Sequence, residues 1–239
     1  ILKGRVDGLE AKVGELEATQ FSTTTKLKGV TYWAVGALDT DVASPSQSEA
    51  LTLNYDLRLA LKTSFTGEDM LTTVLRAGNF ENSDFRNVTL TSQEYAFGPT
   101  GNTFKVGRLF YTFPVGDDLT VTAGPVVRTD DAGMYAGYAT FYPSDLLVDF
   151  FTYGGAWATN NLTNTGSGVG AVYEIGDSGF SVSGNYVSIN GDDSSKGLGT
   201  DESISTSTWQ LFYSGEAFGG NVLAQLGYAY EQGTTTGST

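Results

Sequence analysis

The chain has 239 residues, with 13 lysines and arginines against 27 aspartates and glutamates, and a formal net charge of -14. Because nucleic-acid binding needs clustered cationic side chains, this balance excludes a nucleic-acid partner. The absence of histidine and cysteine excludes Ser-His and Cys-His nucleophiles, disulfides and the usual zinc sites, so we expect no metal ion and no other cofactor. A glycine count of 31, above the average usage of roughly 7%, predicts a β-rich fold with many turns.

Residues 1–21 have the spacing of a coiled-coil helix. Apolar side chains recur at intervals of four and three residues, at Leu2, Val6, Leu9, Val13 and Leu16. A helix this short is only marginally stable on its own. We therefore expect it to be the end of a longer coil or to pack on another part of the protein. Valine at heptad position a and leucine at position d favour a dimeric coiled coil. An ordinary amphipathic helix lying on the following domain, residues 22–239, is the alternative.

From residue 26 onward the apolar period becomes two, most clearly in residues 50–62. The odd positions are apolar: Leu51, Leu53, Tyr55, Leu57, Leu59 and Leu61. The even positions are mostly polar: Thr52, Asn54, Asp56, Arg58, Ala60 and Lys62. A membrane-crossing strand needs about 9 to 11 residues, so this segment predicts a tilted transmembrane strand with one apolar face.

The same alternation predicts about nine strands in the chain. The other eight lie near 26–38, 70–78, 104–113, 119–127, 169–175, 180–186, 209–213 and 222–230. No run approaches the roughly 18 consecutive apolar residues of a transmembrane helix, so a membrane protein of this sequence would be a β-barrel.

The connections between these strands alternate in length. Short turns are expected at 66–69, 115–118, 176–179 and 217–220, and long polar loops at 39–49, 79–103, 128–166 and 190–206. Outer-membrane barrels have short turns at one rim and long loops at the other. The sequence therefore predicts an all-β fold, a transmembrane up-and-down antiparallel β-barrel preceded by the short coiled-coil helix.

Charged side chains within the strands point to a water-filled lumen. Four basic residues occupy the alternate positions that form the polar face of their strands: Arg58, Lys62, Arg76 and Arg108. An arginine facing lipid costs about 2 to 4 kcal/mol at the midplane of the bilayer, so we expect these bases to line a pore. Only two acids after the heptad segment, Asp56 and Glu174, fall in the middle of a predicted strand, and we expect them to line it too.

The loop at 128–166 is far longer than an ordinary hairpin loop, which usually marks a functional segment. Its charged residues include Arg128, Asp130, Asp131, Asp145 and Asp149, and its apolar run at 146–151 requires burial. We interpret it as a constriction loop that folds into the barrel, with its acids facing the basic wall and creating a transverse field. The alternative is an extra buried strand at 146–153.

Three segments resemble the cyanobacterial outer-membrane porins related to OprB-type channels. They are the heptad stretch running into 21–29, the segment 112–125, and the motif 141–144 leading to Gly154 and Gly155. The resemblance covers essentially the whole chain and implies a 16-stranded barrel and a homotrimer in outer-membrane lipid, with the coil in the periplasm. It also implies an upstream S-layer-homology domain that binds peptidoglycan-linked wall polymer. Neither that domain nor the last strands are present, so we expect a longer protein.

The expected function is passive diffusion of inorganic ions and small hydrophilic solutes, without enzymatic activity. The alternative is a structural protein whose barrel ties the outer membrane to the wall through the coil.

Overall fold

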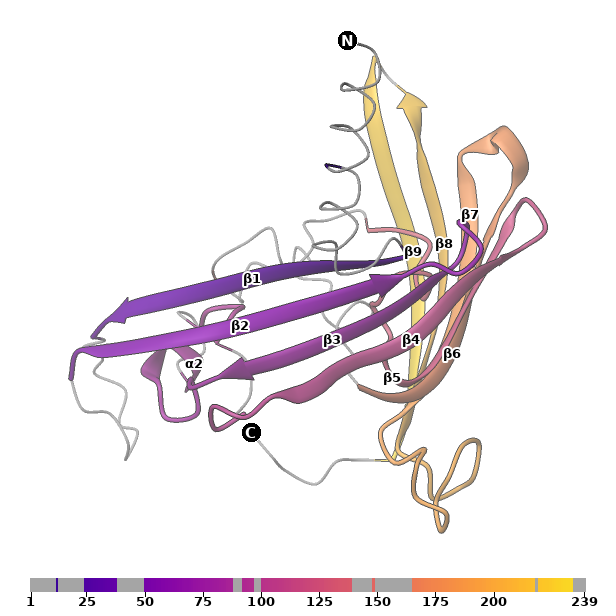
Figure 1. The fold of residues 1–239 in the computed structure, drawn as a ribbon. Coiled ribbons are helices and arrows are strands. Elements are labelled where there is room, and N and C mark those ends of the chain that lie inside the picture. Colours follow the sequence, from indigo (N-terminus) through magenta and orange to yellow (C-terminus); the bar gives the residue numbers. More distant parts are fainter. Residues whose placement is uncertain are drawn as a thin grey trace.

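The computed structural model describes residues 24–37, 50–87, 92–96, 100–138, 165–217 and 219–233, together with Lys12 and Val148. Within these residues, nine strands form one antiparallel sheet in chain order (Figure 1). The strands are β1 (Thr25–Gly36), β2 (Thr52–Thr63), β3 (Met70–Gly78), β4 (Lys105–Val115), β5 (Leu119–Arg128), β6 (Thr165–Glu174), β7 (Phe180–Ser188), β8 (Ser205–Ala217) and β9 (Gly220–Gln232). The expected nine strands and their up-and-down order are confirmed. The coil positions Leu2, Val6, Leu9, Val13 and Leu16 lie outside the described residues.

The connections alternate in length as the sequence predicts. Short turns join β2 to β3, β4 to β5, β6 to β7 and β8 to β9, and longer connections separate the other pairs. The β6–β7 turn contains the 3-10 helix η3 (Gly176–Ser178), and the β3–β4 connection contains the one-turn helix α2 (Asp84–Asn87). No helix of the described residues has both the length and the apolar character needed to cross a membrane.

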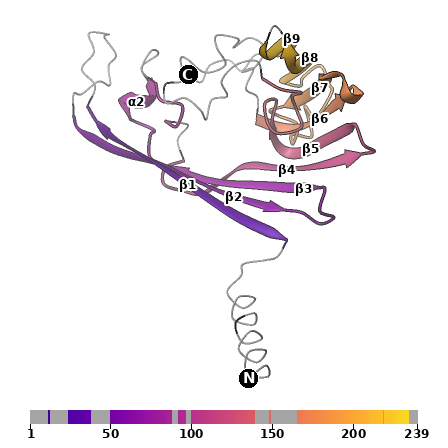
Figure 2. The ribbon, with the colours of Figure 1, turned by 90° about the horizontal axis from the view of Figure 1, so that it is seen from above.

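The sheet curves around the side on which α2 lies (Figure 2). We call this side the concave face and the opposite side the convex face. Ser83, next to α2, donates a hydrogen bond of 2.9 Å to Oδ1 of Asn54 on β2, which assigns the even positions of β2 to the concave face. Register shifts interrupt the ladders between β3 and β4, β4 and β5, and β5 and β6. Such irregularities increase local twist and bend a sheet.

The two faces invert the polarity of an ordinary soluble sheet. On the convex face, Leu53 is 62% exposed, Trp209 61% and Leu226 71%. On the concave face, Asn54 is 7% exposed, Thr208 2% and Gln210 5%. Because neighbours along a strand point to opposite faces, Thr208 and Gln210 are buried on either side of the exposed Trp209. The period-two pattern of the sequence thus becomes an apolar outer face and a polar inner one.

The short β2–β3 turn is held by one carboxylate. Oδ1 of Asp69 accepts hydrogen bonds from the side chain of Ser64, the amide of Phe65, and the amide and hydroxyl of Thr66, at 2.8 to 3.0 Å. Oδ2 accepts one of 2.5 Å from the hydroxyl of Tyr111 on β4. This last bond, followed by those of the turn, holds the pKa of Asp69 well below its ordinary value.

The first part of the long loop after β5 packs inside the sheet. Residues 129–138, which we call the inner strap, lie against the concave sides of β5, β7 and β8. Met134 of the strap is fully buried with Phe110, Val127 and Val187. Further along the same loop, Val148 forms an isolated antiparallel bridge with Gln93. The rest of the alternative strand at 146–153 lies outside the described residues.

Candidate functional site

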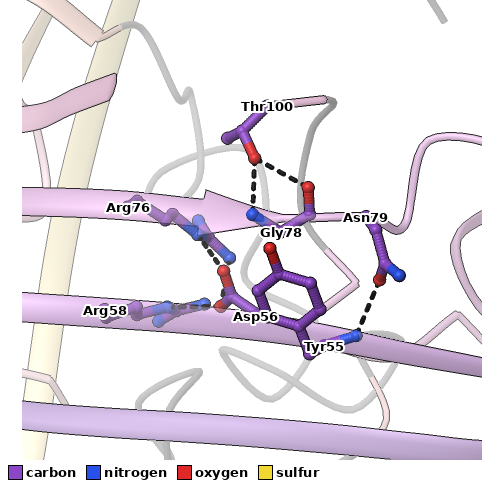
Figure 3. Close-up of polar contacts among 7 residues, drawn as sticks. All are labelled: Tyr55, Asp56, Arg58, Arg76, Gly78, Asn79 and Thr100. Atoms are coloured by element: carbon purple, nitrogen blue, oxygen red, sulfur yellow. Dashed lines mark hydrogen bonds and ion pairs between the residues drawn. The ribbon is translucent and has the colours of Figure 1, made fainter. Parts of the chain in front are cut away.

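One group of charged side chains on the concave face lies on β2 and β3 (Figure 3). The carboxylate of Asp56 accepts a hydrogen bond from Nε of Arg58 at 2.7 Å. It also accepts hydrogen bonds from Nε of Arg76 at 2.6 Å and from Nη2 of Arg76 at 2.7 Å. The two arginines are directly opposite each other in the β2–β3 register. Like charges in opposed positions destabilise a sheet, and the shared carboxylate offsets that repulsion. Asp56 is only 1% exposed, so the three residues form a fixed ionic cluster, which we call the Asp56 triad.

An aromatic pair packs beside the triad. Tyr32 of β1 and Tyr95 of the β3–β4 connection stack with their ring centroids 3.5 Å apart. The guanidinium of Arg58 lies 5.8 Å from the Tyr32 centroid and 5.4 Å from that of Tyr95, within range of a cation–π interaction. Burial, followed by the contact with Tyr32, raises the pKa of Tyr95 to about 12. The pair thus fixes the ring of Tyr95 over β1 and β2.

Backbone contacts at the end of β3 direct the β3–β4 connection inward (Figure 3). The hydroxyl of Thr100 accepts a hydrogen bond from the amide of Gly78 at 2.5 Å and donates one to its carbonyl at 2.8 Å. Asn79 accepts a bond of 2.8 Å from the amide of Tyr55. A side chain at Gly78 would place its Cβ 2.7 Å from the carbonyl oxygen of Tyr55, so only glycine fits this approach.

A second group of charges lies where β4 and β5 meet the inner strap. Arg108 forms an ion pair with Asp131, in which Nε and Oδ2 are 2.7 Å apart. Arg128 forms an ion pair with Asp130, in which Nε and Oδ1 are 2.9 Å apart. Asp131 also accepts the amide hydrogen of Arg128 at 2.7 Å. Burial raises the pKa of Asp131, although Arg108 acts in the opposite direction. The strap acids therefore form direct ion pairs with arginines, where the sequence predicts acids facing a basic wall.

The remaining predicted site residues have different surroundings. Lys62 is exposed one residue before the end of β2. Glu174 is exposed and is the last residue of β6, whereas the sequence places it mid-strand; its amide donates to the carbonyl of Asp118 in the neighbouring turn. The β6–β7 turn begins directly after it, which is why the strand ends here. Asp145 and Asp149 lie outside the described residues.

Sequence reasoning missed the neutral polar residues of β7 and β8. Their concave positions are Ser181, Ser183, Asn185, Thr206, Thr208 and Gln210, all buried. Asn185 and Gln210 bond the backbone of the inner strap. The available signal is their strict alternation with apolar neighbours in the sequence, which predicts a polar face. It does not predict that the face binds a segment more than 50 residues away.

The chemistry of the site is that of fixed charges and hydrogen-bonding groups. Among the described residues, no group of three histidine, cysteine, aspartate or glutamate side chains is arranged to hold a metal ion. Four arginines are paired with carboxylates, and the amides of Asn185 and Gln210 bond the backbone of the inner strap. Such a face can attract, orient and sieve polar solutes.

An up-and-down antiparallel sheet with an apolar convex face and a polar, charged concave face is the arrangement found in the walls of β-barrel porins. The chain belongs to the family described as carbohydrate-selective porin, OprB family, whose profile matches residues 1–237. The resemblance inferred from the sequence is thereby confirmed.

Two relatives and one solved structure are similar to the chain. An uncharacterized protein of Nostoc sp. is 44% identical over 126 residues, covering 48% of this chain and 21% of the relative. An uncharacterized protein of Synechocystis sp. is 36% identical over 123 residues, covering 51% of this chain and 22% of the relative. The high-pH structure of Pseudomonas putida OprB has a TM-score of 0.53 at 17% identity, covering 91% of this chain and 54% of that one. The chain thus spans only part of each of these proteins.

Proposed function

We propose that the chain forms part of the wall of an outer-membrane porin, a passive diffusion channel for inorganic ions and small hydrophilic solutes. The observation that carries the proposal is the inverted sheet, in which exposed leucine, tryptophan and tyrosine cover the convex face while charged and hydrogen-bonding side chains are gathered on the concave one. A lipid-facing wall and a wet lumen require this distribution. The family description adds carbohydrates to the solutes to be tested.

The proposed lining includes a set of charged residues from the concave face and from the inner strap. They are Asp56, Arg58, Lys62, Arg76, Arg108 and Glu174 on the wall, and Arg128, Asp130 and Asp131 at the strap, with Asp145 and Asp149 further along the loop. The Asp56 triad has two cations for one anion, whereas each strap acid is matched by one arginine. Charge selectivity would then depend on how completely the strap acids neutralise the positive charge of their arginines.

The edges of the sheet support a proposal for how the whole protein is completed. Among the described residues, β1 and β9 each pair on one side only, and an unpaired strand edge is not stable in lipid. We propose that further strands close a barrel of about 16 strands. Residues 1–21 would form the periplasmic coil of a homotrimer, and a domain upstream would bind peptidoglycan or wall polymer. The three segments that resemble cyanobacterial porins support this assembly.

Conductance of the full-length protein in planar bilayers tests the proposal. We expect stepwise ion currents without an applied ligand. Replacing Asp130, Asp131, Asp145 and Asp149 together by asparagine should shift the reversal potential in a salt gradient toward anions. The matched control neutralises four acids of the β7–β8 connection, Asp192, Asp193, Asp201 and Glu202, and should shift it less.

Two outcomes would contradict these proposals separately. Full-length protein that is folded and carries no current, yet binds wall polymer, would favour the structural tethering role. Full-length protein that conducts, with a reversal potential that the four loop substitutions leave unchanged, would show that the 128–166 loop does not form the constriction.

A further inference from the structure

We propose that Asn185 and Gln210 are positioning residues that hold the inner strap against the concave face, and that the strap, held in this way, sets the width of the channel. The proposal rests on the proposed porin function. It concerns which wall residues fix the loop, and it assigns that task to two neutral amides on β7 and β8.

Gln210 binds both backbone groups of a single strap residue. Its Oε1 accepts the amide hydrogen of Gly137 at 3.1 Å, and its Nε2 donates to the carbonyl of Gly137 at 2.8 Å. This reciprocal pair is the hydrogen-bond pattern of a β-bridge, supplied by a side chain. A Cβ at position 137 would overlap the ring of Phe212 on the same strand. Gln210 and Phe212 together therefore accept only glycine in this conformation at the strap.

Asn185 joins two other points of the strap. Its Nδ2 donates to the carbonyl of Thr129 at 3.1 Å and to that of Met134 at 3.0 Å. Both hydrogens of the amide group are thus committed to strap backbone, and the side chain is 5% exposed. Since a carboxylate cannot donate and a hydroxyl has one hydrogen, a short uncharged side chain must be an amide to make both bonds here.

The strap is also held by apolar packing and by charge. Met134 is fully buried in the cluster with Phe110, Val127 and Val187. The hydroxyl of Thr122 on β5 donates to the carbonyl of Ala132 at 3.1 Å, and Asp131 pairs with Arg108 on β4. Strands β4, β5, β7 and β8 therefore all contact a segment of ten residues. A loop with so many buried attachments is a fixed part of the lumen wall.

The first arm of the test measures width. In planar bilayers, full-length protein carrying Asn185→Ala and Gln210→Ala should show about a twofold higher single-channel conductance and admit larger uncharged solutes, because conduction depends on pore diameter. The matched control carries Asn190→Ala and Gln232→Ala. These residues donate to the carbonyls of Glu202 at 3.1 Å and Thr200 at 2.7 Å, so they bind a different loop and should leave conductance unchanged.

The second arm measures how firmly the inner strap is attached to the sheet, and it does not require conduction. Tyr135 of the strap is 8% exposed, so chymotrypsin should cleave folded protein there slowly. The Asn185→Ala, Gln210→Ala variant should be cleaved at Tyr135 several times faster than the control. Met134→Ala removes the apolar attachment from the strap side and should act in the same direction, which provides a second test if the double variant does not fold.

The outcomes separate the two proposals. Cleavage at Tyr135 that is equally slow in the double variant, in Met134→Ala and in the control would overturn the anchoring. Faster cleavage with unchanged conductance and solute size limit would overturn the claim that the strap sets the width. An unmodified full-length protein that carries no current would contradict the porin proposal itself.

Discussion

The two ends of the concave face are both polar but are built from different chemistry. On β2 and β3 ionised residues meet, and the buried carboxylate of Asp56 draws Arg58 and Arg76 into one cluster. On β7 and β8 the buried polar residues are uncharged, and Asn185 and Gln210 bind the backbone of the inner strap. Charged groups act on solutes at a distance, whereas amides match the neutral donors and acceptors of a peptide. The comparison indicates that one end supplies the field of the lumen and the other its shape.

The largest effect is expected at the charged end. Asp56→Ala leaves two opposed guanidinium groups without their shared carboxylate, and removing one partner of a buried ionic cluster costs about 3 to 5 kcal/mol. Urea unfolding of the refolded protein in detergent or lipid measures this loss. Asp193→Ala is the control, because its pair with Lys196 spans 3.8 Å between half-exposed side chains, and it should have no measurable effect. Equal stability of both variants would show that the Asp56 triad does not stabilise the sheet.

At the neutral end, Gly137→Ala should be the next most damaging change. The added methyl group overlaps the ring of Phe212, and overpacking of this kind costs about 1 to 3 kcal/mol. The substitution should also speed cleavage of the strap at Tyr135. Gly220→Ala on β9 has open space around the new Cβ and should behave like the unmodified protein. An unaffected Gly137→Ala would mean that the strap does not press on β8.

The pH dependence of selectivity distinguishes the two ends further. Burial raises the pKa of Asp131, so as the pH falls this residue is protonated before an ordinary aspartate with a pKa of about 3.9. Protonation of Asp131 removes the negative charge that neutralises Arg108. The positive charge of Arg108 is then unbalanced, and the reversal potential should move toward anions. Asp131→Asn should show the anion-shifted value at neutral pH and lose this step, whereas Asp193→Asn should retain it. A step that survives in Asp131→Asn would assign it to another group.

The smallest effect at neutral pH is expected for Asp69→Asn in the β2–β3 turn. Asparagine keeps an oxygen for the turn donors but loses the negative charge that accepts the hydroxyl hydrogen of Tyr111. Because the pKa of Asp69 is lowered in the folded protein, its stabilisation is present above the unfolded value of about 3.9 and is lost as the pH falls toward the folded value. Thermal unfolding should therefore depend less on acid pH in the variant than in the unmodified protein.

Sequence alone predicted the features that depend on neighbouring residues. The alternation of leucine from position 51 to 61 specified β2 and its apolar face, because side chains of a strand alternate whatever it pairs with. Short Gly- and Asp-containing segments likewise specified the turns. The charges of Arg58 and Arg76 predicted a polar lumen, although their shared partner Asp56 emerged only when the strand register was known.

Contacts between distant segments were beyond such reasoning. Gln210 bonds Gly137 across 73 residues, and Tyr95 of the β3–β4 connection stacks on Tyr32 of β1. Neither pair has a local pattern, because glutamine and tyrosine occur on any strand or loop. The inward fold of the long loop was predicted from its length and apolar run, but its attachment by the nearer residues 129–138 was not.

The central claim is that the convex face meets lipid and the concave face meets water. The chain contains no cysteine, so single cysteines can be placed at neighbouring positions of opposite phase: Leu59 and Ala60 on β2, and Leu226 and Gln225 on β9. In full-length protein in vesicles, labels at 59 and 226 should be quenched by brominated acyl chains and shielded from iodide. Labels at 60 and 225 should show the reverse. Equal lipid quenching at both members of each pair would contradict the account.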